Sequence, residues 1–179
     1  MIENIKVIYN GVIIEHVKPF SELKKSARKN LNLPREIKIF IFIGGLMPRK
    51  NPIPLLKAFI DIINSNNDIN MIVLGDGELR DECERISENN KGKIHFYGNV
   101  HNITPFLLAS DYYISASLSE GMPTVVMNAM SFGIPSVLSN IKPHIEMFSS
   151  IDNYDFFFEA NDSIDIKNNK EIYEYCMRN

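Results

Sequence analysis

The sequence predicts an α/β domain in which a parallel sheet is covered by helices on both faces. Three observations lead to this prediction: apolar runs of strand length recur along the chain, helix-forming stretches separate them, and the connecting loops are short. Strands that alternate with helices form right-handed βαβ units, which build parallel sheets. Such sheets bind ligands beyond the carboxyl ends of their strands, where the strand order reverses. The loops that follow the strands are therefore the places to search for function.

The first unit begins at residues 37–43, a run of β-branched and aromatic residues with the sequence IKIFIFI. The run ends at Gly44 and Gly45, and a helix is expected to follow because Asn51 suits its cap and Pro52 its first turn. Apolar residues then recur at helical spacing, namely Leu55, Leu56, Phe59, Ile60 and Ile63.

Four further units repeat this pattern. The predicted strands cover residues 70–74, 93–97, 111–117 and 135–139, and the predicted helices cover residues 78–88, 104–109, 124–132 and 142–148. Gly133 is expected to stop one of these helices, because glycine accepts the left-handed conformation that ends many helices. The units predict a domain over residues 36–160. A lead-in segment and linker over 1–35 precede it, and a partly helical tail over 161–179 follows it.

Composition and charge exclude several classes of protein. The chain has 179 residues, is 45% hydrophobic, carries a formal charge of -3 and holds two cysteines. It is too apolar and too weakly charged to be disordered, and two cysteines cannot form a disulfide framework. The sequence also shows no signal peptide, no apolar stretch of the roughly 18 residues that a membrane span needs, and no basic excess. We therefore expect a cytoplasmic protein that binds no nucleic acid.

The loop over residues 44–50 has the features of an anion site. It follows a strand and leads into a helix N-terminus, and it carries Arg49 and Lys50. Free backbone N–H groups, the helix dipole and two cations can meet in such a loop. A solvated Arg–Lys pair beside a tight Gly-Gly turn explains the same residues. The glycine spacing excludes a P-loop, and no GxGxxG motif occurs.

Two more loops carry acidic residues at the same edge of the predicted sheet. Asp76 follows the second strand, where an acidic side chain often meets a ribose hydroxyl, although a cap on the following helix is the favoured interpretation. Glu120 follows the fourth strand, and its carboxylate can accept two hydroxyl donors of a sugar. Asn128 lies about two helical turns further. Taken alone, a Glu in a loop and an Asn in a helix are unremarkable.

The sequence predicts neither a metal site nor a nucleophile. The four histidines lack metal-ligand spacing, and neither cysteine lies near one of them in the sequence. No Ser-His-Asp, Cys-His or GxSxG pattern occurs. His144 and Glu146 follow the fifth strand and, as an isolated pair, are interpreted as structural or solvated side chains.

Six motifs in order resemble the C-terminal, donor-binding half of retaining nucleotide-sugar glycosyltransferases with the two-domain GT-B fold. The motifs are VIYNG, FIGGLMPRKN, VLGDGELR, IHFYGNV, SASLSEGMPTVVMNAMSFGIPSV and NIKPHIE, and they cover most of residues 7–146. The resemblance implies a Rossmann-like domain that forms one half of such an enzyme. It also implies transfer of a sugar, with retention, from a nucleotide-diphosphate sugar to a saccharide or lipid-linked acceptor, in the synthesis of surface polysaccharide or lipopolysaccharide.

The resemblance also implies roles for individual residues. Lys50 matches the lysine that contacts the donor diphosphate, and Glu120 matches the first acid of a Glu-x7-Glu motif, which contacts the transferred sugar. The remaining implied donor-binding residues are Gly44, Gly45, Arg49, Gly98, Val100, Gly121, Met122, Pro123, Thr124 and Asn128. No metal and no resident cofactor are implied, since the nucleotide sugar is the donor substrate.

Two departures from the family pattern remove charge from the site. Gly45 stands where the family usually has an arginine, and Asn128 stands at the second acid of the Glu-x7-Glu motif. Asparagine still accepts a hydrogen bond but lacks the charge that strengthens it, which costs about 1 kcal/mol of donor binding. We therefore expect weakened donor binding.

Only six residues precede the VIYNG motif, so the acceptor-binding N-terminal half of a GT-B enzyme is expected to be missing here. We expect the chain alone to be inactive. The full enzyme is expected in the cytoplasm or peripherally at the inner face of the membrane. The alternative function is a non-catalytic nucleotide-binding or regulatory module derived from a transferase half. The missing GxGxxG motif disfavours a dinucleotide-dependent oxidoreductase on a similar sheet.

Overall fold

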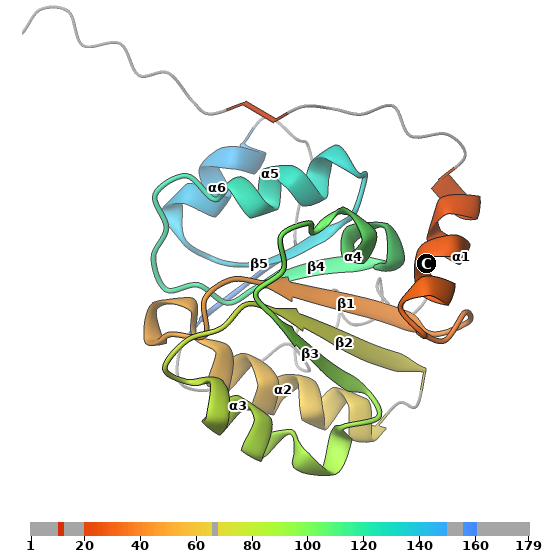
Figure 1. The fold of residues 1–179 in the computed structure, drawn as a ribbon. Helices are drawn as coiled ribbons and strands as arrows, with labels where there is room; N and C mark the ends of the chain where they lie inside the picture. Colours follow the sequence, from red (N-terminus) through yellow and green to blue (C-terminus); the bar gives the residue numbers. More distant parts are fainter. Residues whose placement is uncertain (1–10, 13–19, 66–67, 150–155, 161–179) are drawn as a thin grey trace, which may run out of the picture.

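The computed structural model describes residues 11–12, 20–65, 68–149 and 156–160. Its centre is a six-stranded parallel sheet in the order β3-β2-β1-β4-β5-β6 (Figure 1). The strands are β1 (Lys38–Ile43), β2 (Ile69–Leu74), β3 (Ile94–Gly98), β4 (Tyr112–Ser115), β5 (Ser136–Ser139) and β6 (Phe157–Phe158). The order runs outward from β1 in one direction and from β4 in the other, so it reverses between these two strands.

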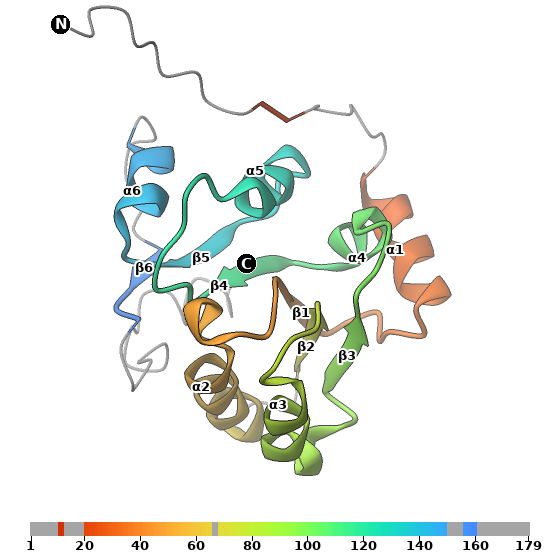
Figure 2. The same cartoon turned by 60° about the vertical axis from the view of Figure 1, so that its left-hand side comes forward.

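Helices cover both faces of the sheet (Figures 1 and 2). One face carries α1 (Phe20–Asn30), α4 (Thr104–Ala109), α5 (Thr124–Ser131) and α6 (Lys142–Phe148). The opposite face carries α2 (Pro52–Ser65) and α3 (Arg80–Ile86). Two short 3₁₀ turns, η1 (Pro48–Lys50) and η2 (Glu88–Asn90), lie in the connections. The predicted parallel sheet with two covered faces is confirmed.

Burial on both faces explains why the first strand has no polar alternation. Phe40 and Phe42 point into the apolar cluster under α2, while Ile39 and Ile41 point into the cluster under the other helices. Successive strand side chains alternate between faces, so a strand covered twice must be apolar at every position. The Phe40 ring also stacks on Tyr112 of β4, with a centroid separation of 4.9 Å.

Helix α1 lies inside residues 1–35, for which the sequence predicts only a lead-in segment and linker. It packs against α4, and Ala27 belongs to the buried core. Beyond its last residue, Asn30, the chain turns at a left-handed asparagine, Asn32 (φ 53°), and the N–H of Leu33 returns to the carbonyl of Arg28. The helix is hard to predict because one of its two buried residues is Arg28, which is only 4% exposed.

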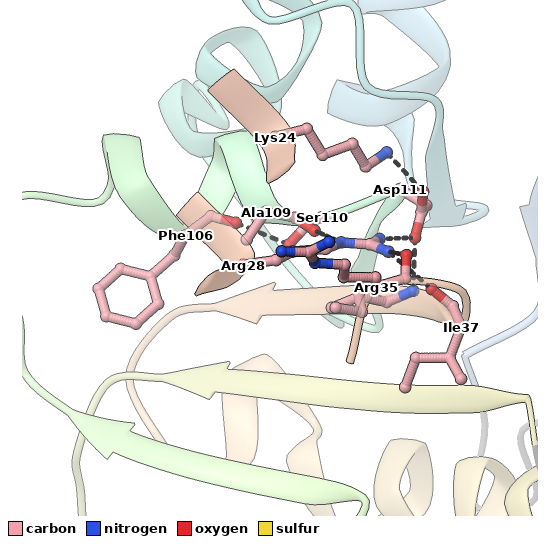
Figure 3. Close-up of polar contacts among 9 residues, drawn as sticks. Lys24, Arg28, Arg35, Ile37, Phe106, Ala109, Ser110 and Asp111 are labelled. Atoms are coloured by element: carbon pink, nitrogen blue, oxygen red, sulfur yellow. Dashed lines mark hydrogen bonds and ion pairs between the residues drawn. The ribbon is translucent and has the colours of Figure 1, made fainter. Parts of the chain in front are cut away.

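An ion cluster fixes α1 to the amino ends of β1 and β4 (Figure 3). We call Lys24, Arg28 and Asp111 the amino-end cluster. The Asp111 carboxylate forms ion pairs with both cations, with Lys24 Nζ at 2.5 Å and with Arg28 Nη2 at 2.6 Å. The remaining guanidinium donors reach three backbone carbonyls, those of Ala109 (2.9 Å), Arg35 (2.5 Å) and Ile37 (3.1 Å). Asp111 also accepts the N–H of Ile39, at 2.6 Å. The buried cation therefore has a partner for each donor group.

Several element boundaries differ from the predicted ones. The helix predicted over residues 78–88 is split into α3 and η2, and the strand predicted over 111–117 is the shorter β4. The short strand β6, which pairs with β5, was not predicted. The stop at Gly133 is confirmed, because its φ is 67° and its N–H bonds the carbonyl of Met130. The tail over 161–179 lies outside the described residues.

Candidate functional site

The candidate site lies at the carboxyl ends of β1 and β4, where the strand order reverses. The loop after β1 supplies Arg49 and Lys50, and the loop after β4 supplies Glu120. We call these three residues the carboxyl-end cluster. Parallel sheets place their ligand sites at this position because the loops on the two sides diverge there.

The loops after β1, β2 and β3 are joined through their backbones. The N–H of Leu46 donates to the carbonyl of Asp76 (2.9 Å), and the N–H of Gly75 donates to that of Gly98 (2.8 Å). Gly75 has φ 126°, and a Cβ there would lie 2.0 Å from the carbonyl oxygen of Gly44. Glycine is therefore required where the second loop touches the first. These backbone contacts among the three loops form a rigid base for the site, which we call the rigid floor.

The predicted cap role of Asp76 is wrong. Its Oδ1 accepts the adjacent N–H of Gly77 at 2.8 Å, and the helix that follows begins only at Arg80. Leu79 holds the N-cap position and makes no side-chain cap. A cap at Asp76 would need an N–H such as that of Leu79, which donates instead to the carbonyl of Leu46 in the neighbouring loop.

Lys50 is held by its stem. The stem lies beside Gly44, where a Cβ would be 3.6 Å from both Cδ and Cε of the lysine. The side chain is 19% exposed, and its Nζ contacts Oε1 of Glu120, which is 10% exposed. Asn51 follows in the left-handed conformation (φ 54°) and turns the chain into α2. An aliphatic stem against the loop backbone limits where the ammonium group can go.

Arg49 contacts the same carboxylate from the solvent side. Its Nη1 lies 3.1 Å from Oε2 of Glu120 and donates to the carbonyl of Ser119 at 2.8 Å, while the side chain is 48% exposed. The backbone supports this contact, because the N–H of Leu118 donates to the carbonyl of Arg49 at 2.9 Å. Both loops therefore remain together independently of the ion pairs.

The charge of Glu120 is stabilised by its neighbours. Burial raises the pKa of this carboxyl group, but hydrogen bonds from Lys50 and Ser117, the charge of Lys50 and the bond from Arg49 outweigh burial. The resulting pKa lies below the ordinary value, so Glu120 is an anion at neutral pH.

A layer of buried hydroxyl groups and His144 supports the loop that carries Glu120. Ser139 Oγ donates to the carbonyl of Ser117 at 2.6 Å, and His144 Nδ1 lies 2.9 Å from the carbonyl of Ser139. Since a carbonyl only accepts, Nδ1 carries the proton. Burial lowers the pKa of His144, and its Nε2 is buried without a partner among the described residues. Of the two interpretations of His144 from the sequence, the structure supports the structural one.

The other predicted donor-site residues surround the cluster without all touching it. Gly121 and Met122 lie in the loop, Pro123 holds the N-cap position of α5, and Thr124 is the first helical residue. Asn128 is half-buried in α5. Within the described residues, hydrogen bonds join Arg49 and Lys50 to Glu120, but none joins Asn128 to these three.

Gly98 and Val100, two of the implied donor-binding residues, lie at the same edge of the sheet, Gly98 as the last residue of β3 and Val100 just after it. Gly98 is left-handed (φ 67°), and a Cβ there would lie 3.6 Å from Nη1 of Arg80. Arg80 also lies over the Phe96 ring at 5.1 Å and donates to Gly75 at 3.4 Å. Arg80 lies in the helix predicted over residues 78–88 and was not singled out from the sequence, since an arginine four residues before Glu84 looks like one half of an ordinary surface ion pair.

A cavity of about 650 Å³ lies between α5 and α6, beside the loop that follows Glu120. Much of its wall is apolar, with Met122, Met127, Met130, Pro143 and Met147. None of the helices in the described part of the chain has the length and apolar character needed to cross a membrane. Among residues 11–12, 20–65, 68–149 and 156–160, no group of three or more His, Cys, Asp or Glu side chains could hold a metal ion.

Comparison with known proteins gives related sequences for most of the chain. The family model described as "Glycosyl transferases group 1" matches residues 24–170. UDP-Gal:alpha-D-GlcNAc-diphosphoundecaprenol alpha-1,3-galactosyltransferase of Escherichia coli is 35% identical over 142 residues, which are 76% of this chain and 37% of that protein. The putative teichuronic acid biosynthesis glycosyltransferase TuaC of Bacillus subtilis is 29% identical over 133 residues, 73% of this chain and 32% of that protein. The chain thus spans about a third of the length of these relatives.

Solved structures share the fold. A glycosyltransferase from Rickettsia africae superposes with a TM-score of 0.71 at 18% identity, over 90% of this chain and 42% of that one. Anabaena Alr3699/HepE, solved in complex with UDP and glucose, superposes with a TM-score of 0.69 at 22% identity, over 79% and 40% of the two chains. The fold likeness and the sequence match agree with the resemblance inferred from the six motifs. The chain therefore belongs to the group 1 glycosyltransferase family and has the Rossmann-like fold of one half of a GT-B glycosyltransferase.

Proposed function

We propose that this chain is the donor-binding domain of a retaining glycosyltransferase. The full enzyme transfers a sugar from a nucleotide-diphosphate sugar to a saccharide or lipid-linked acceptor, in the synthesis of surface polysaccharide or lipopolysaccharide. The observation that carries the proposal is the contact between Lys50 and Glu120, which are 70 residues apart and meet where the strand order reverses. These are the two residues to which the family resemblance gives the diphosphate and the sugar.

The chemistry of the cluster suits the departure of a nucleoside diphosphate. Breaking the bond between sugar and diphosphate leaves negative charge on the phosphate oxygens, and fixed cations stabilise it. Lys50 and Arg49 supply two cations on one loop. Glu120 accepts hydrogen bonds from hydroxyl groups of the sugar.

The relatives guide the choice of acceptor. The Escherichia coli relative is named as a galactosyltransferase that acts on a diphosphoundecaprenol-linked sugar. A polyprenol-linked acceptor lies at a membrane surface, so we propose that the full enzyme works at the inner face of a membrane. The acceptor would be bound by an N-terminal half, without which we expect this domain to be inactive in transfer.

A second candidate is a non-catalytic nucleotide-binding or regulatory module. Two residues favour it, since Gly45 and Asn128 both lack a charge that the family pattern usually has. One assay distinguishes the two functions, in which the full protein is mixed with a nucleotide-sugar donor and a polyprenyl-diphosphate sugar as acceptor. A transferase moves the sugar to the acceptor, whereas a non-catalytic module binds the donor without turnover.

Binding of nucleoside diphosphates tests the donor site directly. Isothermal titration calorimetry of the chain with UDP, GDP, ADP, CDP and dTDP is expected to find at least one that binds. Absence of binding by all five at millimolar concentration would contradict the proposed function in both forms.

A further inference from the structure

Both cations of the carboxyl-end cluster are paired with a carboxylate of the chain itself. Lys50 Nζ contacts Oε1 of Glu120, and Arg49 Nη1 lies 3.1 Å from Oε2. These are the groups that the proposed function gives to the donor diphosphate. Glu120 is also the group that it gives to the sugar. A diphosphate and the Glu120 carboxylate therefore compete for the same cations.

The site can exchange one anion for the other without opening. The backbone bond from Leu118 to Arg49 holds the two loops together at 2.9 Å, whatever the ion pairs do. The Lys50 stem stays against Gly44, so its ammonium group needs to swing only at the end. The loop that carries Glu120 is held from below as well, because Ser139 Oγ donates to the carbonyl of the fully buried Ser117 at 2.6 Å.

The released carboxylate then needs new donors. Glu120 is only 10% exposed, so water compensates little for the loss of two cationic partners. A sugar joined to the diphosphate brings hydroxyl groups to this position, and they can donate to both carboxylate oxygens. A nucleoside diphosphate without the sugar brings none and leaves the carboxylate short of partners.

We infer that Glu120 is an exchangeable counter-ion that makes the donor site select nucleotide sugars over free nucleoside diphosphates. The nucleotide sugar displaces Glu120 from Lys50 and satisfies it through the sugar. Once the sugar has been transferred, Glu120 returns to Lys50 and helps to expel the nucleoside diphosphate. This inference rests on the proposed function and adds product release to it.

The test uses inorganic pyrophosphate, which carries the anion but neither base nor sugar. Glu120→Gln keeps the shape of the side chain but cannot pair with the cations. We expect it to bind pyrophosphate about tenfold more tightly than the wild type, a difference of about 1.4 kcal/mol. Glu78→Gln is the matched control, because it removes the same charge from an exposed position in the neighbouring loop. It is expected to change the affinity less than about twofold, since solvent screens exposed charges.

The sugar preference gives a second readout. With the nucleoside diphosphate that binds and its hexose conjugate, the wild type is expected to prefer the conjugate, and Glu120→Gln is expected to lose most of that preference. Pyrophosphate binding by Glu120→Gln that is equal to or weaker than that of the wild type would overturn the inference and leave the proposed function standing. If no nucleoside diphosphate binds either the wild type or Glu120→Gln, the inference and the proposed function both fail.

A measurement on the wild type does not depend on the variant's folding. Carbon-13 NMR follows the Glu120 carboxylate during a pH titration with and without saturating pyrophosphate. Loss of the cations and arrival of a neighbouring anion are expected to raise the pKa of Glu120 towards its ordinary value. An unchanged pKa in the pyrophosphate complex would overturn the exchange.

Discussion

Two clusters of charged side chains join the same pair of strands, β1 and β4, at opposite ends. In the amino-end cluster, Arg28 is 4% exposed and donates to three backbone carbonyls in addition to its carboxylate. In the carboxyl-end cluster, Arg49 is 48% exposed and donates to one backbone carbonyl, that of Ser119, so the two cations depend mainly on the Glu120 carboxylate. Fixed carbonyls cannot be replaced by a ligand, whereas a carboxylate can be replaced by another anion. The first cluster is therefore a structural joint, and the second has the properties of a binding site.

The largest effect is expected at the amino end. Arg28→Ala leaves the Asp111 carboxylate without its buried partner and three carbonyls without a donor, so the free energy of unfolding should fall by about 3–5 kcal/mol. Urea unfolding measures the change. Lys29→Ala, an exposed neighbour on α1, is the control and should change stability by less than about 0.5 kcal/mol. A loss below about 1 kcal/mol for Arg28→Ala would show that the cluster is not a structural joint.

A smaller loss is expected from the backbone of the carboxyl end. Gly75→Ala places a Cβ 2.0 Å from the carbonyl oxygen of Gly44 at a φ of 126°, so the two loops must separate. We expect about 2–3 kcal/mol of destabilisation and weaker nucleotide binding. Gly92→Ala is the matched control, because a Cβ there meets nothing within 4 Å. Equal stability of the two variants in urea would contradict the rigid floor.

The layer beneath Glu120 should respond to pH. Burial lowers the pKa of His144 from 6.5, so the unfolded chain binds a proton more readily than the folded one. The stability that this group contributes is present above pH 6.5 and is lost as the pH falls through the folded value. His144→Asn keeps a donor near the Ser139 carbonyl and should flatten the decline. His144→Leu should cost about 1 kcal/mol at pH 7.5, because the Ser139 carbonyl loses one of its two donors and keeps the N–H of Ile141 at 2.8 Å. Identical pH profiles for the wild type and His144→Asn would contradict this assignment.

The smallest effect is a gain. Gly45→Arg restores the cation of the family pattern, and the one close approach of its Cβ is to the end of the flexible Met47 side chain at 2.7 Å, while the carbonyl oxygen of Asp76 lies at an ordinary 3.7 Å. We expect nucleoside diphosphates to bind more tightly by about 1 kcal/mol. Gly92→Arg adds the same charge at an open position and serves as the control in the same calorimetric titration. An equal gain in both variants would mean that net charge, rather than position, sets the affinity.

The sequence predicted the sheet and missed the parts that depend on polar burial. The apolar run before Gly44 can only be a strand covered on both faces, and the structure confirms it. The same reasoning could not predict helix α1, because its buried contact with the sheet is made by Arg28. An arginine looks like a surface residue until its partners are known, and two of them, Ala109 and Asp111, lie 81 and 83 residues away in the sequence. The cap predicted at Asp76 failed because a neighbouring loop takes the N–H of Leu79.

The site was predictable only in part. Lys50 and Glu120 were identified through the family resemblance, since neither residue is distinctive by itself. Their contact, and that of Arg49 with the same carboxylate, depends on the pairing of β1 with β4, which no local pattern contains. The buried support at His144 depends likewise on the pairing of β4 with β5.

The central claim is that the carboxyl-end cluster binds the diphosphate of a nucleotide donor. The most direct test compares Lys50→Ala with Lys57→Ala, an exposed lysine on α2, using NMR titrations with a nucleoside diphosphate and with the matching nucleoside. Lys50→Ala is expected to weaken diphosphate binding at least about tenfold, or about 1.4 kcal/mol, and to leave nucleoside binding unchanged. Lys57→Ala should alter neither. Equal losses for nucleoside and diphosphate in Lys50→Ala, or no loss for either, would contradict the claim.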